Sequence, residues 1–486
     1  MLKLKKYHIF SVAYIYLCLP VLIFFSGWLR LYLGLSLSAL LLISLFFIIR
    51  SARQDEKGII EIPLSVLFIA ALIIFLWCIL SGQGGFYYQS NDWHYRNAIF
   101  HDLINFSWPV VYPKTGAGLV YYIAHWLPAA LVGKLLGWQA GNVALLFWTF
   151  TGIYLTFVLL YSFLKVDTKK KAYFLLIVLI LFSGLDFIGS MYMQIRNGTP
   201  IPLHLEWWGA PSQYSSNTTQ LMWVFNQSVA PWLLTVLLLN QKKLSNIGML
   251  TVLVMPFAPL PFFGFAPIAA AIAVKRLIEL IKQRKTSQIL KEIFTPQNII
   301  GLFAVFPVFY FYYTANVQAQ HSGINSFDLS EILTTLIPFL LLEFLVYTLV
   351  IFKRYKNDYL FIFINLMLLI IPFIRIGEAQ DFTMRASIPA LFILMIYVIR
   401  FVFDEIREKK RISLHVLMII ILLTIGSITP FTEQYRAIRS IVTDGIVADV
   451  ADSIKTLSNS SDENSNFLCV NPDNSFFYRY LAKQKK

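Results

Sequence analysis

The stretch GLVYYIAHWLPAALVGKLL, residues 118–136, decides how this chain would be placed in a membrane. It is apolar enough to cross a bilayer as a helix, which takes about 20 predominantly apolar residues. It also contains His125, Pro128, Lys134 and aromatic side chains, a composition typical of a segment that lies at the membrane interface. Whether it crosses fixes the side of the membrane on which every later loop lies.

The composition around this stretch is that of a polytopic membrane protein. Of the 486 residues, 58% are hydrophobic and 14% are charged, and the mean hydropathy is +0.66. The apolar runs are long and continuous rather than alternating, so they predict helices and not the strands of a barrel. We therefore predict an all-α fold with about 13 transmembrane spans, at 9–29, 33–49, 63–81, 143–164, 172–193, 219–239, 246–261, 262–281, 298–315, 332–352, 359–375, 386–403 and 412–429.

The basic residues fix the predicted orientation. Seven clusters hold 26 of the 40 Lys and Arg residues, at 3–6, 50–57, 165–171, 242–243, 275–291, 353–356 and 400–411. Short cytoplasmic loops collect Lys and Arg, and all seven clusters fall on the cytoplasmic side if 118–136 does not cross. We predict that it lies at the outer interface, with the N-terminus inside and the C-terminus outside. The net charge of +14 then reflects topology and does not indicate nucleic-acid binding.

This orientation gives a simple domain organisation. A transmembrane hairpin (1–62) precedes a transmembrane core (63–403) with a long outer loop at 82–142, and a last span with a short outer tail follows (404–486). The three cysteines are scattered and predict neither a disulfide framework nor a metal site. Polar residues concentrate in the outer loops, so we expect the functional site on the outer side.

The first outer loop carries the stretch QSNDWHYRNAIFHDLINFSWPV, residues 89–110. Asn91 and Asp92 are good residues for capping a helix, and the helix expected after them is amphipathic. Its polar face includes His94, His101 and Asp102, and we expect the helix to lie flat on the outer surface. Asp92 is either only a helix cap or a functional acid at the outer end of a span, where an unpartnered carboxylate is costly.

Two later outer loops offer further candidates. His204 and Glu206 stand beside two tryptophans, which suit either sugar stacking or the aromatic belt of a membrane protein. The loop 375–385 carries two arginines on the side that is normally poor in them. They would bind an anionic headgroup or pair with neighbouring carboxylates. The candidates in this loop are Arg375, Glu378, Asp381 and Arg385.

This layout resembles the GT-C class of integral-membrane glycosyltransferases. The resemblance covers chiefly 82–165: an aspartate just after an early span, a flat amphipathic helix, and a second interfacial helix before the next span. It implies a GT-C-like fold for 63–403 and transfer of a sugar from a polyprenyl-phosphate donor to a lipid or glycan acceptor on the non-cytoplasmic face. A bacterial plasma membrane is the expected location, with the endoplasmic reticulum as the open alternative.

The resemblance also implies roles for the candidates. Asp92 would be the catalytic base, and Lys114, Arg375 and Arg385 would hold the lipid phosphate. The remaining outer-loop candidates would line the substrate site: His94, His101, Asp102, His204, Glu206, Glu378 and Asp381. A single in-line displacement would invert the anomeric carbon. No cofactor or protein-bound metal is required, and a divalent cation stays an open alternative.

Other functions fit parts of the same sequence. A transporter or flippase of a lipid-linked or sugar substrate would favour broken helices, and the prolines and glycine of 256–267 interrupt 246–281. A polymerase or ligase of lipid-linked glycans would use similar outer-face residues. No phosphate-gripping Gly-rich loop, HExxH sequence or Ser-His-Asp spacing is present, so the sequence gives no support to nucleotide-driven chemistry.

Overall fold

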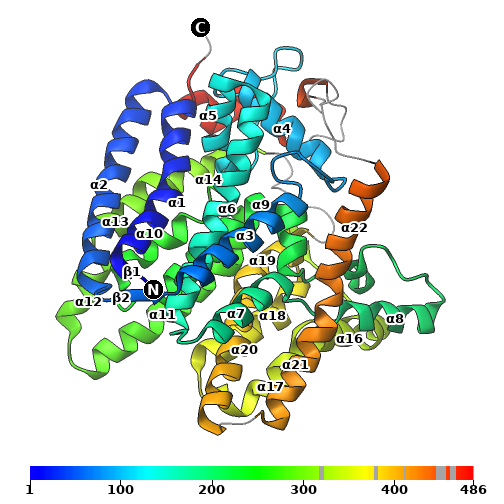
Figure 1. The fold of residues 1–486 in the computed structure, drawn as a ribbon. Coiled ribbons are helices and arrows are strands. Elements are labelled where there is room, and N and C mark those ends of the chain that lie inside the picture. The colour runs from blue at the N-terminus through cyan, green and yellow to red at the C-terminus, as the bar shows by residue number, and fades with distance from the viewer. Residues whose placement is uncertain (317–321, 377–380, 410–411, 445–455, 460–466, 485–486) are drawn as a thin grey trace.

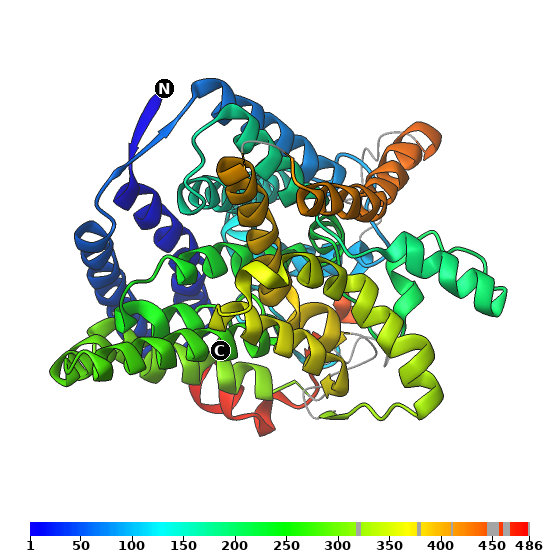
Figure 2. The same ribbon diagram turned by 90° about the horizontal axis from the view of Figure 1, so that it is seen from below.

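The computed structural model describes residues 1–316, 322–376, 381–409, 412–444, 456–459 and 467–484. It is mostly helical, with 75% of residues in helices and 5% in strands, so the predicted helical class is confirmed. The N-terminus and α22 (Ile428–Asp444) lie on opposite sides of the molecule (Figures 1 and 2).

The chain begins with a helical hairpin. α1 (Lys6–Trp28) packs along α2 (Leu31–Asp55), and a short antiparallel pair, β1 (Leu2–Lys5) with β2 (Ile59–Ile62), closes its base. The apolar side chains of α2 are largely exposed, as expected for a helix that faces lipid.

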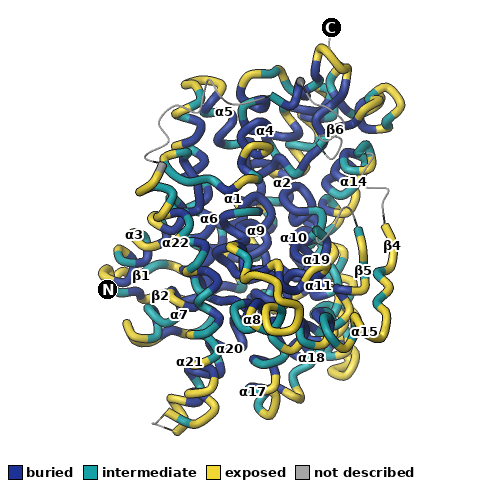
Figure 3. The backbone as a smooth tube through the Cα atoms, turned by 90° about the vertical axis from the view of Figure 1, so that its right-hand side faces the viewer, coloured by how far each residue is buried: buried dark blue, intermediate teal, exposed yellow. Residues whose placement is uncertain are grey.

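A central group of helices surrounds α9 (Asn217–Leu239), which is the most buried long helix of the described chain (Figure 3). Trp232 and Gln220 of α9 hydrogen-bond to each other, which satisfies two polar groups inside this core. The helices packed around α9 include α6 (Trp138–Phe163), α7 (Lys169–Leu181) and α20 (Ile388–Lys409), and α3 (Leu64–Leu80) packs on α6 and α7.

The remaining elements complete the bundle. They are α4 (Trp93–Asn105), α5 (Leu127–Leu136), α8 (Asp186–Asn197), α10 (Ile247–Val252), α11 (Pro259–Lys282), α12 (Thr286–Ile293), α13 (Pro296–Ile300), α14 (Phe306–Thr314), the continuous helix Leu329–Tyr355 that ends in α17 (Val346–Tyr355), α18 (Tyr359–Ile370), α19 (Asp381–Ala386) and α21 (Leu414–Gly426). Two further short strand pairs join β3 (Gly118–Leu119) to β6 (Leu468–Cys469) and β4 (Ser322–Ile324) to β5 (Ile374–Ile376).

Among the described residues, seven helices are long and apolar enough to cross a membrane, or eight if α12 and the helix Pro296–Thr314, bent by 49°, count as one span. This is compatible with a multi-pass membrane protein, with fewer long helices than the predicted spans. The expected span 246–261 is interrupted: α10 has only six residues, and turns fill 253–257. The expected tail after 430 begins as a helix, since α22 continues to Asp444. Glu433 of α22 contacts His204.

The stretch 118–136 does not form a helix of spanning length. Only α5 is α-helical there, and its ten residues rise about 15 Å, roughly half the hydrocarbon thickness. α5 packs against α6 as a short antiparallel helix next to α4, near the top of Figure 1. The expectation that this stretch does not cross agrees with its length.

Direct contacts and shared grooves connect all seven basic clusters at one end of the molecule, called the basic end below. A groove lined by Lys275 and Arg354 joins the fifth cluster to the sixth, and another lined by Lys171 and Arg400 joins the third to the seventh. Ion pairs Lys6–Glu56 and Lys243–Asp55 join the first and fourth clusters to the second. The Leu244 amide donates to Glu292, which pairs with Arg276, so the fourth cluster contacts the fifth. The ion pair Arg354–Glu408 joins the sixth cluster to the seventh. One end of the molecule therefore gathers the basic loops, as the predicted orientation requires, and the side of the membrane that this end faces stays a prediction.

Candidate functional site

A cavity of about 590 Å³ lies where the expected outer loops 82–142 and 375–385 meet the tail. α4, the 120–122 segment, α19 and the end of the chain line it together with the first turn of α11 and one face of α14. These segments are far apart in sequence, so the cavity exists only in the folded chain. Its polar and aromatic lining includes Asp92, Tyr95, Arg96, Tyr121, Tyr122, Tyr310, Tyr313, Asp381, Arg385 and Phe467.

Asp92 lines this cavity and forms an ion pair. It precedes α4 at the capping position, but its side chain makes no capping hydrogen bond. Instead Arg96 Nη2 donates to Asp92 Oδ2 at 2.8 Å, and Arg96 Nη1 donates to Asn226 Oδ1 of α9 at 3.3 Å. Arg96 is buried while the Asp92 side chain keeps 44% of its exposure. The carboxylate is therefore held by Arg96 and keeps part of its surface accessible to a ligand.

Arg385 approaches the cavity from α19. Its side chain is buried and forms an ion pair with Asp381, one turn earlier on the same helix. Burial alone would lower the pKa of the Arg385 guanidinium, but the charge of Asp381 raises it above its ordinary value, so the group stays cationic. Its Nε has no hydrogen-bond partner among the described residues. A buried donor of this kind gains from an anionic ligand.

Aromatic and aliphatic side chains form the rest of the wall. Tyr121 and Tyr122 stack with their ring centroids 4.0 Å apart, and burial raises the pKa of both phenols, so both stay neutral donors. Phe262 and Phe263 of α11 and Phe306 of α14 also line the cavity. One site thus combines two guanidinium groups, two carboxylates and a broad apolar wall.

The end of the chain supplies part of this wall. Phe467 stacks on Tyr95 at 5.4 Å between ring centroids, and its carbonyl accepts from the Val120 amide at 2.9 Å. The pairing of β3 with β6 follows, and Tyr478 Oη donates to the Leu119 carbonyl at 2.9 Å. A Cβ at Gly118 would lie 2.3 Å from the Tyr478 ring, so this close approach requires glycine. The tail was expected to be a short outer segment, and the structure uses it to complete the cavity.

The residues of the predicted polar face of α4 differ in how far they are buried. His94 is exposed, and His101 is partly exposed beside the Trp138 ring. Asp102 is fully buried, where it accepts hydrogen bonds from Tyr112 Oη at 2.9 Å and the Leu457 amide at 3.0 Å. The expected flat helix on the outer surface is therefore wrong in part: the 112–119 loop and residue 457 cover one side of α4. None of the three residues lines the cavity.

Three further candidates do not line the cavity or do not belong to the described residues. Lys114 is exposed on the turn before β3, away from the cavity lining. Arg375 is exposed in β5, opposite Gly323 of β4, while its neighbour Ile376 lines the cavity. Glu378 lies outside the described residues.

His204 and Glu206 belong to a separate buried cluster. His204 Nδ1 lies 2.8 Å from Glu433 Oε1 of α22, and Glu206 accepts from the Ser216 amide at 2.9 Å. Burial, helped by the charge of Asp186, raises the pKa of Glu206 to about 7. These contacts tie residues 204–216 to α9 and α22. Within the described residues, no group of three or more His, Cys, Asp or Glu side chains is arranged to hold a metal ion.

Arg96 is the main residue that sequence reasoning left out. It was not among the predicted site residues, yet it lines the cavity and pairs with Asp92. The spacing of four residues between Asp92 and Arg96 is the signal that could have identified it, because such pairs meet on one face of a helix. Tyr121 and Tyr122 had no comparable signal, since their partners come from distant segments.

No protein-family model, curated protein or solved structure matches this chain. The resemblance to the GT-C class therefore stays a prediction, and the interpretation of the site rests on its geometry.

Proposed function

We propose that this chain is an integral-membrane glycosyltransferase that moves a sugar from a polyprenyl-phosphate donor to an acceptor hydroxyl. One observation carries the proposal: Asp92, Arg96 and Arg385 line the same cavity, and the rest of its wall is largely apolar. A lipid-linked sugar phosphate has the matching parts, namely an anionic phosphate, a polar sugar and a hydrocarbon chain.

The two guanidinium groups would take the phosphate. Guanidinium binds phosphate through two parallel N–H donors, and such charge-assisted hydrogen bonds are about twice as strong as neutral ones. Arg96 replaces Lys114 in this role, because Arg96 lines the cavity and Lys114 does not. Cations at the phosphate stabilise the negative charge that develops as the bond from the sugar to the phosphate breaks.

Asp92 would act on the acceptor. Its carboxylate is held by Arg96 and remains open on its other side, so it can accept the proton of an incoming hydroxyl. The hydroxyl oxygen attacks the anomeric carbon, the polyprenyl phosphate leaves, and the configuration inverts. The chain of the donor would lie along the wall formed by Phe262, Phe263 and Phe306.

The experiment that tests the function class uses proteoliposomes supplied with a polyprenyl-phosphate donor labelled in its sugar. The proposal predicts that label leaves the donor and appears in a new lipid or glycan product. Movement of intact donor between leaflets without breakage of the sugar–phosphate bond would contradict it and would favour a flippase.

A further inference from the structure

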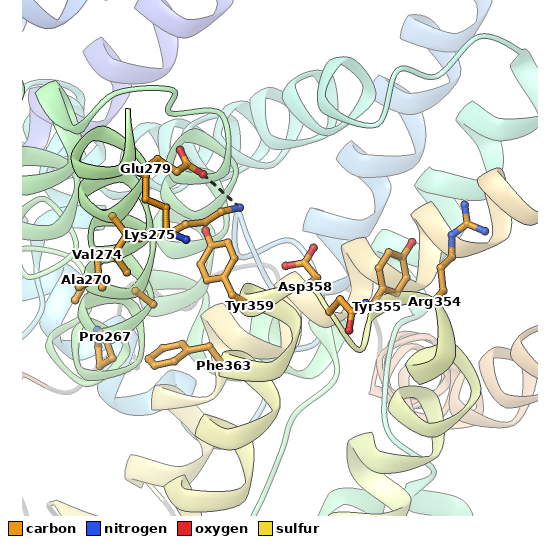
Figure 4. A pocket seen from close by; sticks show the side chains of 14 residues that line it. Pro267, Ala270, Val274, Lys275, Glu279, Arg354, Tyr355, Asp358, Tyr359 and Phe363 are labelled. Carbon is orange, nitrogen blue, oxygen red and sulfur yellow. Dashed lines mark ion pairs between the residues drawn. The ribbon is translucent and has the colours of Figure 1, made fainter. Parts of the chain in front are cut away.

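A second groove, with a volume of about 1130 Å³, lies at the basic end of the molecule. It runs between α11 and the turn that joins α17 to α18 (Figure 4). None of its lining residues lines the candidate catalytic cavity. We call it the α11–α18 groove.

The floor of the α11–α18 groove is apolar. Pro267, Ala270, Val274 and Ile278 recur at helical spacing, so they form one face of α11. The alanine leaves room between the helices, and Phe363 of α18 closes the opposite side. A surface of this shape accommodates a hydrocarbon chain that lies along the helix.

The rim of the groove is polar and carries both signs of charge. Lys275 Nζ stands 4.2 Å from the centroid of the Tyr359 ring and 3.9 Å from Glu279 Oε1 (Figure 4). Lys282 extends the same face by two turns and forms no ion pair with a described residue. Asp358 lies across the groove, where it caps α18 through the Leu360 amide at 3.0 Å.

Arg354 also lines the rim, but its guanidinium is already paired with carboxylates. Its guanidinium donates to both carboxylate oxygens of Glu408, at 2.6 and 3.0 Å, and lies near Asp404 and Glu405. Without it, the rim holds two lysines and two carboxylates. A purely anionic headgroup would place its extra negative charge beside Glu279 and Asp358, whereas a zwitterion meets both signs.

We propose that the α11–α18 groove binds a phospholipid with a zwitterionic headgroup. Its phosphate lies at Lys282, its ammonium lies at Glu279, and one acyl chain lies on the floor formed by Ala270, Val274 and Phe363. Basic pockets between helices at a membrane surface are recurrent sites for lipid headgroups. The proposal rests on placement of the helices in a membrane and is independent of the transfer chemistry.

Native mass spectrometry of the full chain tests this proposal. The protein is released from mixed micelles with equal amounts of phosphatidylethanolamine, phosphatidylglycerol and phosphatidylcholine. We expect adducts of the two zwitterionic lipids in preference to phosphatidylglycerol, reduced at least about fivefold in the Lys275→Ala/Lys282→Ala variant. The control, Lys285→Ala/Lys353→Ala, removes the same charge from exposed positions outside the groove and should retain the adducts.

Two further variants separate the parts of the site. Ala270→Trp fills the floor, so it should remove the bound lipid whatever its headgroup. Glu279→Gln keeps the floor and both lysines, so total lipid binding should persist while the preference for zwitterionic lipids over phosphatidylglycerol disappears. Equal or stronger retention of phosphatidylglycerol by the unaltered protein, an equal loss in the control variant, or an unchanged adduct in Ala270→Trp would each overturn the proposal.

Discussion

Replacement of Arg385 by methionine distinguishes a role in phosphate binding from a role in the stability of the fold. Methionine keeps much of the side-chain volume and removes the charge. Its partner Asp381 keeps 46% of its side-chain exposure, so water can solvate the carboxylate that is left. We therefore expect a small effect on folding, about 1 kcal/mol or less, as for a half-exposed ion pair.

The effect of Arg385→Met on donor binding should be much larger. A hydrogen bond to a charged group contributes about 1.5–3 kcal/mol, which corresponds to about 10- to 150-fold in the dissociation constant. The assay is titration of the purified protein with a short-chain polyprenyl phosphate, followed by tryptophan fluorescence, alongside a thermal unfolding curve.

The Asp381→Asn variant is the matched comparison for Arg385→Met. It removes the ion pair but leaves the guanidinium at the cavity, so donor affinity should be kept or increased. If Arg385 serves only its pair with Asp381, both variants should leave donor affinity unchanged and lower stability alike. That result would refute the assignment of Arg385 to the phosphate.

Three other expectations follow from the fold. A cysteine at Lys170, between the expected spans, should resist an impermeant thiol reagent applied outside intact cells, because this basic loop is cytoplasmic if 118–136 does not cross. Phe467→Ala should weaken donor binding more than it lowers the melting temperature, since Phe467 stacks on Tyr95 in the cavity wall; equal losses would indicate a purely structural role. The raised pKa of Glu206 means that the folded state favours its protonated form, so its contribution to stability is complete below the ordinary carboxyl pKa and is lost as the pH rises towards about 7. Unfolding curves at pH 5 and pH 8 should therefore differ less for Glu206→Gln than for the unaltered protein, and an unchanged difference would contradict this.

The sequence was informative where a single segment carried the signal. The apolar runs predicted the helical class, and the placement of basic residues predicted that 118–136 is not a span-length helix. The predicted span 246–261 was interrupted, because hydropathy does not report the breaks after α10. Those breaks depend on prolines and on packing against neighbouring helices.

Prediction of the site was partial for a similar reason. Asp92, Asp381 and Arg385 were chosen because charges at an outer membrane face need partners, and all three line one cavity. Asp102 was misplaced because its burial depends on Tyr112 and on residue 457, which no periodicity of α4 could reveal.

The most direct test of the central claim is the rate of sugar transfer by Asp92→Asn, measured together with donor affinity. Asparagine keeps the size of the side chain and can still accept from Arg96, so folding and donor binding should persist. Loss of a general base should lower the turnover rate by about two to four orders of magnitude. The control Asp167→Asn makes the same change in an exposed acid at the basic end and should transfer normally. Near-normal transfer by Asp92→Asn, with intact donor binding, would contradict the account and leave Asp92 as a structural partner of Arg96.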